Sequence, residues 1–381
     1  MQVPNLCSFT REHEKCASSR KWVRHEDRSR SFGEHAFRSH VRKGQLRALA
    51  WSRQSKGVVV RILIVGGTSF VGRAISWSAW HHGHDVTVLN RGVTPNDLPE
   101  KIERIVGDRQ GDLSSVESRT FDVTIDAIAY RPSDVERLAN ALGDRGGHYI
   151  QISSISAYDD PGIEGANETT ASLWGDDEAD PNGPVTGTTY GPLKAASERA
   201  GLRFFGDGAT MVRPTFVIGS FDATLRFPYW VERVRRGGVI AVPGPRTNNM
   251  QYVDARDLAN FVVRVADEHL RGAFHVAGPQ PGDHFFNMVD QIASHVAPVG
   301  TTLREVRAED VLAARLEGKF PLWSGAQSEN ILALDSTLAL SNGLDLRPLS
   351  DSVDDVASWW GERAWPERWL TSADEARLLE K

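Results

Sequence analysis

A glycine-containing turn between a buried strand and a helix is the feature that most restricts how this chain can fold. Residues 58–65 read VVVRILIV, which is typical of a central parallel strand buried on both faces. In the turn that follows, Gly66 and Gly72 are the outer glycines and Ser69 stands at the middle position. Such a turn brings backbone amides and a helix N-terminus close to a phosphate group. The sequence therefore predicts a phosphate-binding turn made of Gly66, Gly67, Thr68, Ser69, Phe70, Val71 and Gly72.

Strands and helices alternate after this turn. Strands are expected at 85–90, 102–106, 122–127, 149–153 and 209–212, with helices at 70–82, 113–118, 133–142 and 189–205. This alternation predicts an α/β fold with a doubly wound parallel Rossmann sheet. Beyond about residue 215 the segments are shorter, with helices expected near 222–236, 254–268, 284–297, 308–316 and 350–361 and strands near 239–242 and 273–276. We expect a Rossmann domain at 58–214, a smaller mixed α/β substrate lobe at 215–365 that is partly woven back into it, and a tail at 366–381.

The first 57 residues differ from the rest of the chain in charge. They hold 13 Lys and Arg against 5 Asp and Glu, a net charge of +8, which leaves −14 for residues 58–381. We expect this segment to be disordered and dispensable, and three interpretations stay open: a nucleic-acid arm, a transit peptide, or upstream sequence before an internal start. The acidic body repels polyanions, so nucleic acid is not an expected partner.

Composition also bears on the cellular compartment. No apolar run reaches the ~20 residues that cross a bilayer, and no signal peptide is recognisable. Both cysteines, Cys7 and Cys16, lie in the basic segment, which excludes a disulfide scaffold for the body. We expect a cytoplasmic protein without a membrane segment, and a homodimer stays open.

The ends of the next strands indicate the kind of dinucleotide. NAD-binding turns place an acidic residue at the end of the second strand, where it binds the ribose, whereas an Arg there accommodates the 2′-phosphate of NADP. This chain has Asn90 and Arg91, so NADP is expected, with NAD as the alternative. Asp108 and Arg109 follow the third strand and are placed for the adenine edge, and Ala127 ends the fourth strand.

A tyrosine and a lysine supply the candidate chemistry. Tyr190 and Lys194 are four residues apart on an expected helix, so their side chains share one face. A cation beside a phenol favours the phenolate, which makes the tyrosine a usable acid and base. Chance alone would produce such a pair at an appreciable rate, but its place after the fifth strand and its loops faces the edge where Rossmann ligands bind. The serines at 153, 154 and 156 end that strand and offer a hydroxyl for a substrate oxygen.

Six ordered stretches make the chain from residue 60 to about 361 resemble an extended or atypical short-chain dehydrogenase/reductase of the NAD-dependent epimerase/dehydratase family. They are Gly66–Gly72, Gly107-Asp108, Ser153–Tyr158, Tyr190–Lys194, Arg213-Pro214-Thr215 and Tyr252–Ala259. The resemblance implies an NAD(P)-dependent enzyme. It also implies Ser154, Tyr190 and Lys194 as catalytic residues, with Pro214 and Thr215 beside the nicotinamide.

Two departures narrow the expected substrate. Sugar-nucleotide 4,6-dehydratases of this family carry an Asp-Glu pair after the catalytic hydroxyl, where this chain has Ile155 and Ser156. Related 4-epimerases carry a phosphate-binding Arg where this chain has Met250, for which Arg246 is a substitute. We therefore expect hydride transfer at a carbonyl or hydroxyl group of a small molecule. Whether the molecule is sugar-derived, and whether the enzyme is an epimerase or a reductase, stays open.

A second hypothesis is a non-catalytic dinucleotide sensor or an RNA-associated protein of the same fold. Plant chloroplast stem-loop-binding proteins resemble the same subgroup, but the charge of −14 on residues 58–381 argues against such a role. No metal site is expected. Cys7, Cys16 and His25 fit no zinc spacing, and His81, His82 and His84 are typical of a solvated helix end.

Overall fold

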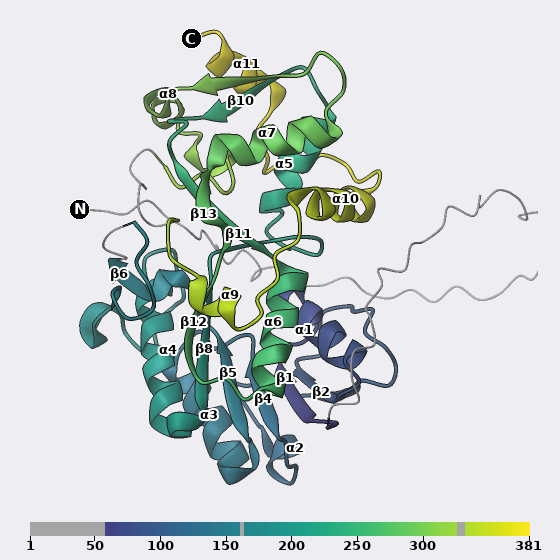
Figure 1. The fold of residues 1–381 in the computed structure, drawn as a ribbon, viewed down its shortest axis with the longest axis vertical. Coiled ribbons are helices and arrows are strands. Elements are labelled where there is room, and N and C mark those ends of the chain that lie inside the picture. The colour runs from purple at the N-terminus through teal and green to yellow at the C-terminus, as the bar shows by residue number, and fades with distance from the viewer. Residues whose placement is uncertain (1–57, 161–163, 326–331) are drawn as a thin grey trace, which may run out of the picture.

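The computed structural model describes residues 58–160, 164–325 and 332–381, and it shows an upper and a lower lobe (Figure 1). The expectations for residues 1–57 lie outside this part of the chain. The lower lobe in Figure 1 contains the parallel sheet, and the upper lobe contains most of the C-terminal helices and the shorter strands.

One seven-stranded parallel sheet organises the lower lobe, in the order β12-β8-β5-β4-β1-β2-β3. The predicted doubly wound α/β fold is confirmed. Its strands are β1 (Arg61–Val65), β2 (Asp85–Asn90), β3 (Glu103–Val106), β4 (Val123–Asp126), β5 (His148–Ile152), β8 (Ala209–Pro214) and β12 (Gly272–Val276).

Helices cover both faces of this sheet because successive side chains of a strand point to opposite sides. Ile62 and Ile64 of β1 belong to the core beneath α1 (Phe70–His81) and α6 (Ala255–Asp267). Leu63 and Val65 belong to the core on the opposite face, beneath α2 (Ser114–Glu117), α3 (Pro132–Leu142) and α4 (Tyr190–Phe205). All four side chains are at most 1% exposed, as the unbroken apolar run predicts.

The direction of winding reverses between β1 and β4. The chain passes from β1 to β2 and β3 on one side of the sheet and continues with β4, β5, β8 and β12 on the other. Loops that leave adjacent strands in opposite directions open a crevice at the carboxyl ends of those strands, and open α/β sheets bind ligands there. The carboxyl ends of β1 and β4 are therefore the expected ligand edge.

The upper lobe is built on a second core. Helices α5 (Arg226–Arg235), α7 (Phe285–Val296) and α10 (Leu349–Trp360) pack together, with Trp230, Phe285 and Val356 among the buried residues. Two small sheets complete the lobe. One pairs β10 (Val239–Pro243) with β14 (Thr302–Val306), and the other has the order β13-β11-β9, with strands Gly278–His284, Asn249–Asp254 and Phe216–Ile218.

The remaining elements are short. They are α8 (Ala308–Ala313), α9 (Thr337–Ser341), β6 (Tyr158–Asp160), β7 (Ser172–Leu173) and the 3₁₀ turns Gly143–Arg145, Ile155–Ala157, Asp176–Glu178, Gly206–Gly208 and Glu317–Lys319. The expected tail at 366–381 contains helix α11 (Ser372–Leu379), which lies beside β10 (Figure 1). Because Trp369 and Leu378 are buried in the upper core, this end of the chain is part of the lobe. None of the described helices is long and apolar enough to cross a bilayer.

Candidate functional site

The glycine turn is tightly folded at the carboxyl end of β1. Gly66 has φ +84°, a conformation that side chains disfavour, and a Cβ at Gly72 would lie 2.2 Å from the carbonyl oxygen of Gly66. The buried hydroxyl of Ser76 donates to the carbonyl of Gly67 at 2.8 Å and ties the turn to α1. Ser69 is exposed at the N-cap of α1, and its side chain makes no cap hydrogen bond there. The turn therefore presents α1's first amides at the ligand edge, in the arrangement that suits a phosphate group.

An exposed arginine, Arg91, follows the end of β2. The Asn90 side chain accepts a hydrogen bond from the backbone amide of Gly92 at 2.8 Å, so it caps a turn. Arg91 is exposed, and no hydrogen bond or ion pair to its guanidinium occurs within the described part of the chain. Val93 and Val106 are 73% and 70% exposed and lie beside this turn.

The side chains of Asp108 and Arg109 take different directions. Asp108 is exposed and accepts a hydrogen bond from the amide of Gln110. Arg109 is buried and donates to both carboxylate oxygens of Asp126, at 2.6 and 2.8 Å, and to the carbonyl of Asp134. Its guanidinium therefore links β4 to α3 through these hydrogen bonds. Only the backbone of Arg109 is left for the adenine contact expected from the sequence.

Tyr190 and Lys194 share the inner face of the first turns of α4, as the four-residue spacing predicts. Nζ of Lys194 lies 5.8 Å from the ring centre of Tyr190. It donates to the carbonyls of Ala129 at 3.0 Å and Ile152 at 2.8 Å, which follow β4 and end β5. An ammonium has three N–H donors, and no acceptor among the described residues takes the third.

Burial governs the charge of this lysine. Lys194 is 2% exposed, and desolvation lowers the pKa of its ammonium to about 8. The carboxylates of Asp126 and Glu198 act in the opposite direction and raise this pKa, but each is already paired with an arginine. The lysine therefore remains largely protonated at neutral pH and loses its charge in the mildly alkaline range.

A close approach of two backbones brings Ser154 to the same end of α4. A Cβ at Gly191 would lie 2.3 Å from the carbonyl oxygen of Ser156, so only glycine allows the start of α4 to touch this turn. Ser154 is half-buried, and its Oγ accepts from the amide of Ser156 at 3.1 Å, which leaves its hydroxyl proton free to donate. Ile155, at the position of a dehydratase acid, is buried in the upper core.

A buried polar chain connects α4 with β8 and β12. Both carboxylate oxygens of Glu198 accept hydrogen bonds from Arg213, whose Nη1 also donates to Oη of Tyr158 at 2.6 Å. Tyr158 in turn lies 2.5 Å from Nε2 of His275, and Nδ1 of His275 lies 2.9 Å from the carbonyl of Asp335. Burial lowers the pKa of His275, which suits a neutral ring that donates from Nδ1 and accepts from Tyr158.

The residues after Arg213 end the strand at the ligand edge. Pro214 ends β8, and Thr215 follows with its amide bonded to the carbonyl of Val276. The hydroxyls of Thr215 and Ser153 are buried and have no hydrogen-bond partner in the described structure. Ala127, after β4, donates its amide to the carbonyl of Val65, so it lies next to the glycine turn.

Sequence reasoning missed Tyr130 and Glu198, and it placed Arg213 in a motif without giving this residue a role. Tyr130, Glu198 and Arg213 contact catalytic candidates or hold the elements that carry them. Tyr130 was recognisable, because an aromatic residue just after a central strand stands at the ligand edge. The pairing of Glu198 with Arg213 had no such signal, since an ion pair leaves no periodic pattern.

The position of the 4-epimerase arginine, occupied here by Met250, and its suggested substitute Arg246 both lie in the upper lobe. Met250 is fully buried in the upper core. Arg246 pairs with Glu305 at 3.1 Å and covers the ring of Phe286, so its guanidinium is engaged within the upper lobe.

The described residues form no metal site. His84 pairs with Asp267, and no group of three or more metal-ligating side chains occurs in the described ranges. Cys7, Cys16 and His25 lie outside them.

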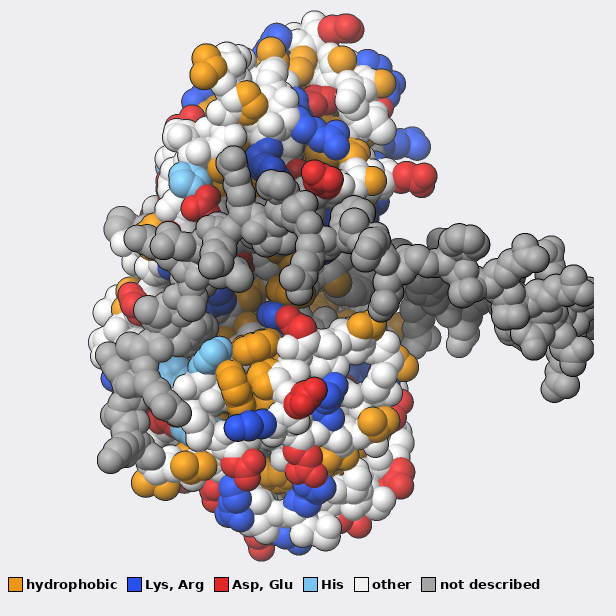
Figure 2. All heavy atoms as spheres, turned by 90° about the vertical axis from the view of Figure 1, so that its right-hand side faces the viewer, with side chains coloured by type: hydrophobic (Ala, Val, Ile, Leu, Met, Phe, Trp, Pro, Cys, Tyr) orange, Lys and Arg blue, Asp and Glu red, His pale blue; other side chains and the backbone are white. Residues whose placement is uncertain are grey.

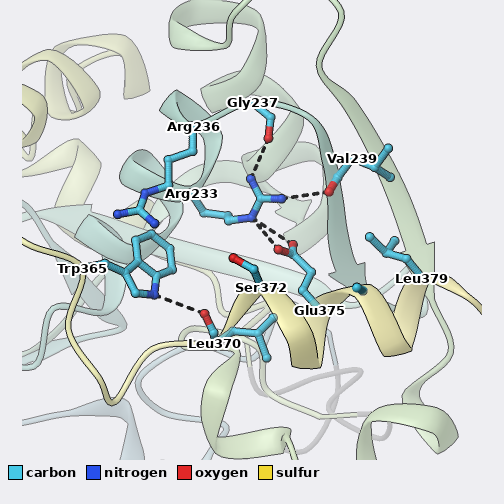
Figure 3. Close-up of a pocket in the computed structure, with 10 residues that line it drawn as sticks. Arg233, Arg236, Gly237, Val239, Trp365, Leu370, Ser372, Glu375 and Leu379 are labelled. Atoms are coloured by element: carbon cyan, nitrogen blue, oxygen red, sulfur yellow. Dashed lines mark hydrogen bonds and ion pairs between the residues drawn. The ribbon is translucent and has the colours of Figure 1, made fainter.

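A separate cavity of about 310 Å³ lies in the upper lobe between the end of α5, the start of β10 and α11 (Figure 3). Arg233 points across it to Glu375, with Nε 2.9 Å from each carboxylate oxygen, and also donates to the carbonyls of Gly237 and Val239. The guanidinium of Arg236 lies 3.9 Å from the ring centre of Trp365. Because the central ion pair is satisfied by the protein itself, it fastens α11 to the lobe.

Comparison with known proteins agrees with this geometry. Residues 62–277, more than half of the chain, match the NAD dependent epimerase/dehydratase family, and the chain belongs to that family. A chloroplast stem-loop binding protein of 41 kDa b from Arabidopsis thaliana is 28% identical over 257 residues, which are 63% of this chain and 62% of the relative. The chain thus matches less than two thirds of that relative's length.

Solved structures of epimerases share the fold. The enzyme WbmH of Bordetella bronchiseptica, in complex with NAD⁺, has a TM-score of 0.60 at 14% identity over 80% of this chain and 99% of its own. UDP-N-acetylglucosamine 4-epimerase from Bacillus cereus has a TM-score of 0.57 at 16% identity over 82% of this chain and 100% of its own. At these identities the likeness establishes the fold.

Proposed function

We propose that this protein is an NAD(P)-dependent oxidoreductase or epimerase acting on a carbonyl or hydroxyl group of a small molecule. The observation that carries the proposal is the placement of the Lys194 ammonium 5.8 Å from the Tyr190 ring, at the carboxyl ends of β4 and β5. A protein that only sensed a dinucleotide would not need a phenol beside a buried ammonium.

The residues at this edge fit a dinucleotide. Gly66 and Gly72 let the turn fold tightly against the start of α1, whose N-terminal amides would bind a pyrophosphate. The buried hydroxyls of Ser153 and Thr215 and the third N–H of Lys194 have no protein partner in the described structure, and ribose and nicotinamide groups would satisfy them. We assign this role to those residues, with Ala127 and Pro214 as neighbouring contacts.

A bound nicotinamide would supply or accept hydride. The chain's own groups would handle the proton: Tyr190 exchanges it with the substrate oxygen, and the positive charge of Lys194 favours the phenolate. Ser154 donates a hydrogen bond to the same oxygen, since its Oγ already accepts one from the amide of Ser156. Ile155 and Ser156 cannot exchange protons as an Asp-Glu pair does, so we do not extend the proposal to 4,6-dehydration.

We favour NADP over NAD. Asn90 is neutral and engaged in its own turn, while the guanidinium of Arg91 is exposed and has no partner among the described residues. A 2′-phosphate at the end of β2 would meet that cation, whereas the ribose of NAD would find no carboxylate there.

Stem-loop binding is the second candidate, because the Arabidopsis relative carries that name. The charge distribution argues against it. Residues 58–381 have a net charge of −14, and on the face shown in Figure 2 the Lys and Arg side chains are interspersed with Asp and Glu. Phosphate backbones bind to continuous basic surfaces.

The direct test is to identify what the purified protein retains and then to assay it. Mass spectrometry of extracted small molecules would reveal the dinucleotide and its oxidation state. Aldehydes, ketones and sugar derivatives would then be screened for a change in nicotinamide absorbance or for epimerised product, with Tyr190→Phe as the control. We expect this variant to lose turnover while keeping cofactor affinity within a few-fold. Full activity of Tyr190→Phe would refute the assignment.

A further inference from the structure

A second tyrosine contacts the buried lysine. Tyr130 follows β4, and its ring centre lies 4.8 Å from Nζ of Lys194, closer than the ring of Tyr190 at 5.8 Å. The two ring centres are 6.3 Å apart, with the planes inclined by 50°. The ammonium therefore lies within cation–π range of two aromatic rings that come from different elements.

The turn that carries Tyr130 is built around the lysine. The carbonyl of Ala129 accepts from Lys194, and the carboxylate of Asp134 accepts from the amides of Tyr130 and Arg131 at 3.3 and 3.1 Å. These bonds fix the backbone on both sides of the ring. Its approach to the ammonium is thus imposed by the turn between β4 and α3.

Core packing does not account for this ring. Tyr130 is 38% exposed and belongs to none of the three apolar cores of the described chain. Its neighbour Ala129 is fully buried. A large aromatic side chain that is partly exposed at the ligand edge, with its ring beside a buried ammonium, suggests a role at that ammonium.

Compensation for the buried charge of Lys194 is otherwise incomplete. The charged groups that act on it come from β4, α3, α4 and the segment after β3, and they are Asp126, Asp134, Glu198 and Arg109. Arg109 opposes the positive charge and also pairs with Asp126, while Glu198 pairs with Arg213. Within the described structure, the faces of Tyr130 and Tyr190 and two carbonyl oxygens also favour the ammonium.

We propose that Tyr130 is a positioning residue whose ring keeps the Lys194 ammonium charged and in place, and so sets the pH range over which the lysine holds the cofactor. Tyr130 acts through Lys194 rather than on the substrate. The inference rests on the proposed function only in assuming that Lys194 contacts a dinucleotide.

The test compares Tyr130→Leu, which replaces the ring with a smaller apolar side chain, with Tyr130→Phe, which removes only the hydroxyl. Calorimetry or fluorescence would give the dissociation constant of the cofactor from about pH 6 to about pH 10, across the range in which a buried lysine ionises. We expect affinity to fall as the lysine loses its proton, with the same midpoint in the wild type and Tyr130→Phe. The midpoint should lie about half a unit to one unit lower in Tyr130→Leu.

Two outcomes would overturn the proposal: a Tyr130→Leu profile that coincides with the wild type, or a Tyr130→Phe profile that shifts as far as Tyr130→Leu. Thermal melting checks folding. If Tyr130→Leu does not fold, Tyr130→Trp replaces it, because an indole attracts a cation more strongly and should not lower the midpoint; a lower midpoint in that variant would count against the ring. The cofactor titrations do not depend on turnover. An active Tyr190→Phe would therefore refute the proposed function, while the pH profiles of the Tyr130 variants would still test the role of the ring.

Discussion

Glu198 and Arg213 form a buried bidentate ion pair, with Nη2 of Arg213 2.5 Å from Oε2 of Glu198 and side chains that are 7% and 1% exposed for Arg213 and Glu198. Glu198 lies one helical turn beyond Lys194 on α4, and Arg213 lies one residue before Pro214 at the end of β8. This ion pair therefore holds α4, which carries Tyr190 and Lys194, against β8.

Breaking this pair should be costly. Glu198→Gln leaves a buried guanidinium without its counter-charge, and we expect the free energy of unfolding to fall by about 3–5 kcal/mol. Urea denaturation would measure the change. The exposed pair of Arg264 and Glu268 provides the control, since Glu268→Gln should cost no more than about 1 kcal/mol. Equal losses in the two variants would contradict the role given to burial.

Gly72 should tolerate no side chain. In Gly72→Ala the new Cβ would lie 2.2 Å from the carbonyl oxygen of Gly66, so the turn must open. We expect a loss of about 1–3 kcal/mol of stability from the overpacking, together with a large loss of cofactor affinity. Thermal melting and cofactor titration would measure both. Gly318→Ala is the matched control, because its Cβ would meet nothing within 4 Å; if both variants bind the cofactor equally well, the turn is not the binding element.

Arg91 should discriminate between the two dinucleotides. We expect NADP(H) to bind more tightly than NAD(H), because an exposed guanidinium follows a strand end without a carboxylate. In Arg91→Ala the preference should narrow through weaker binding of NADP(H), with little change for NAD(H). Fluorescence titration of both reduced cofactors would show this. Tighter binding of NADH by the wild type would reject the expectation.

His148 should make the protein sensitive to acid. Burial lowers its pKa from 6.5 to about 3, and Nε2 is bonded to Oγ1 of Thr210 at 2.8 Å. Between these values the unfolded chain binds a proton that the folded chain does not, so stability falls as the pH falls below about 6.5. At pH 5 the loss should be about 2 kcal/mol relative to pH 7. His148→Gln, which cannot titrate, should flatten this slope in urea denaturation; an unchanged slope would assign the acid sensitivity to other groups.

Local sequence patterns determined the sheet, the glycine turn and the Tyr190–Lys194 pair. A short β-branched apolar run that ends at a glycine turn is typical of a strand covered on both faces, and β1 is one. A four-residue spacing places two side chains on the same face wherever the helix lies. These features depend on residues near one another along the chain, so they can be read without the tertiary structure.

Tertiary structure alone decided which distant residues meet. It turned Arg109 inward onto Asp126, set Tyr130 against Lys194, and joined Glu198 to Arg213. It also formed the short strands β9, β11 and β13 and incorporated α11 into the upper core, where the sequence had suggested mixed segments and a tail. These partners are separated by many residues along the chain. The sequence contains no periodic pattern that indicates which polar side chain pairs with which. Their pairing is fixed only when the folded sheet brings strand ends together and excludes water from them.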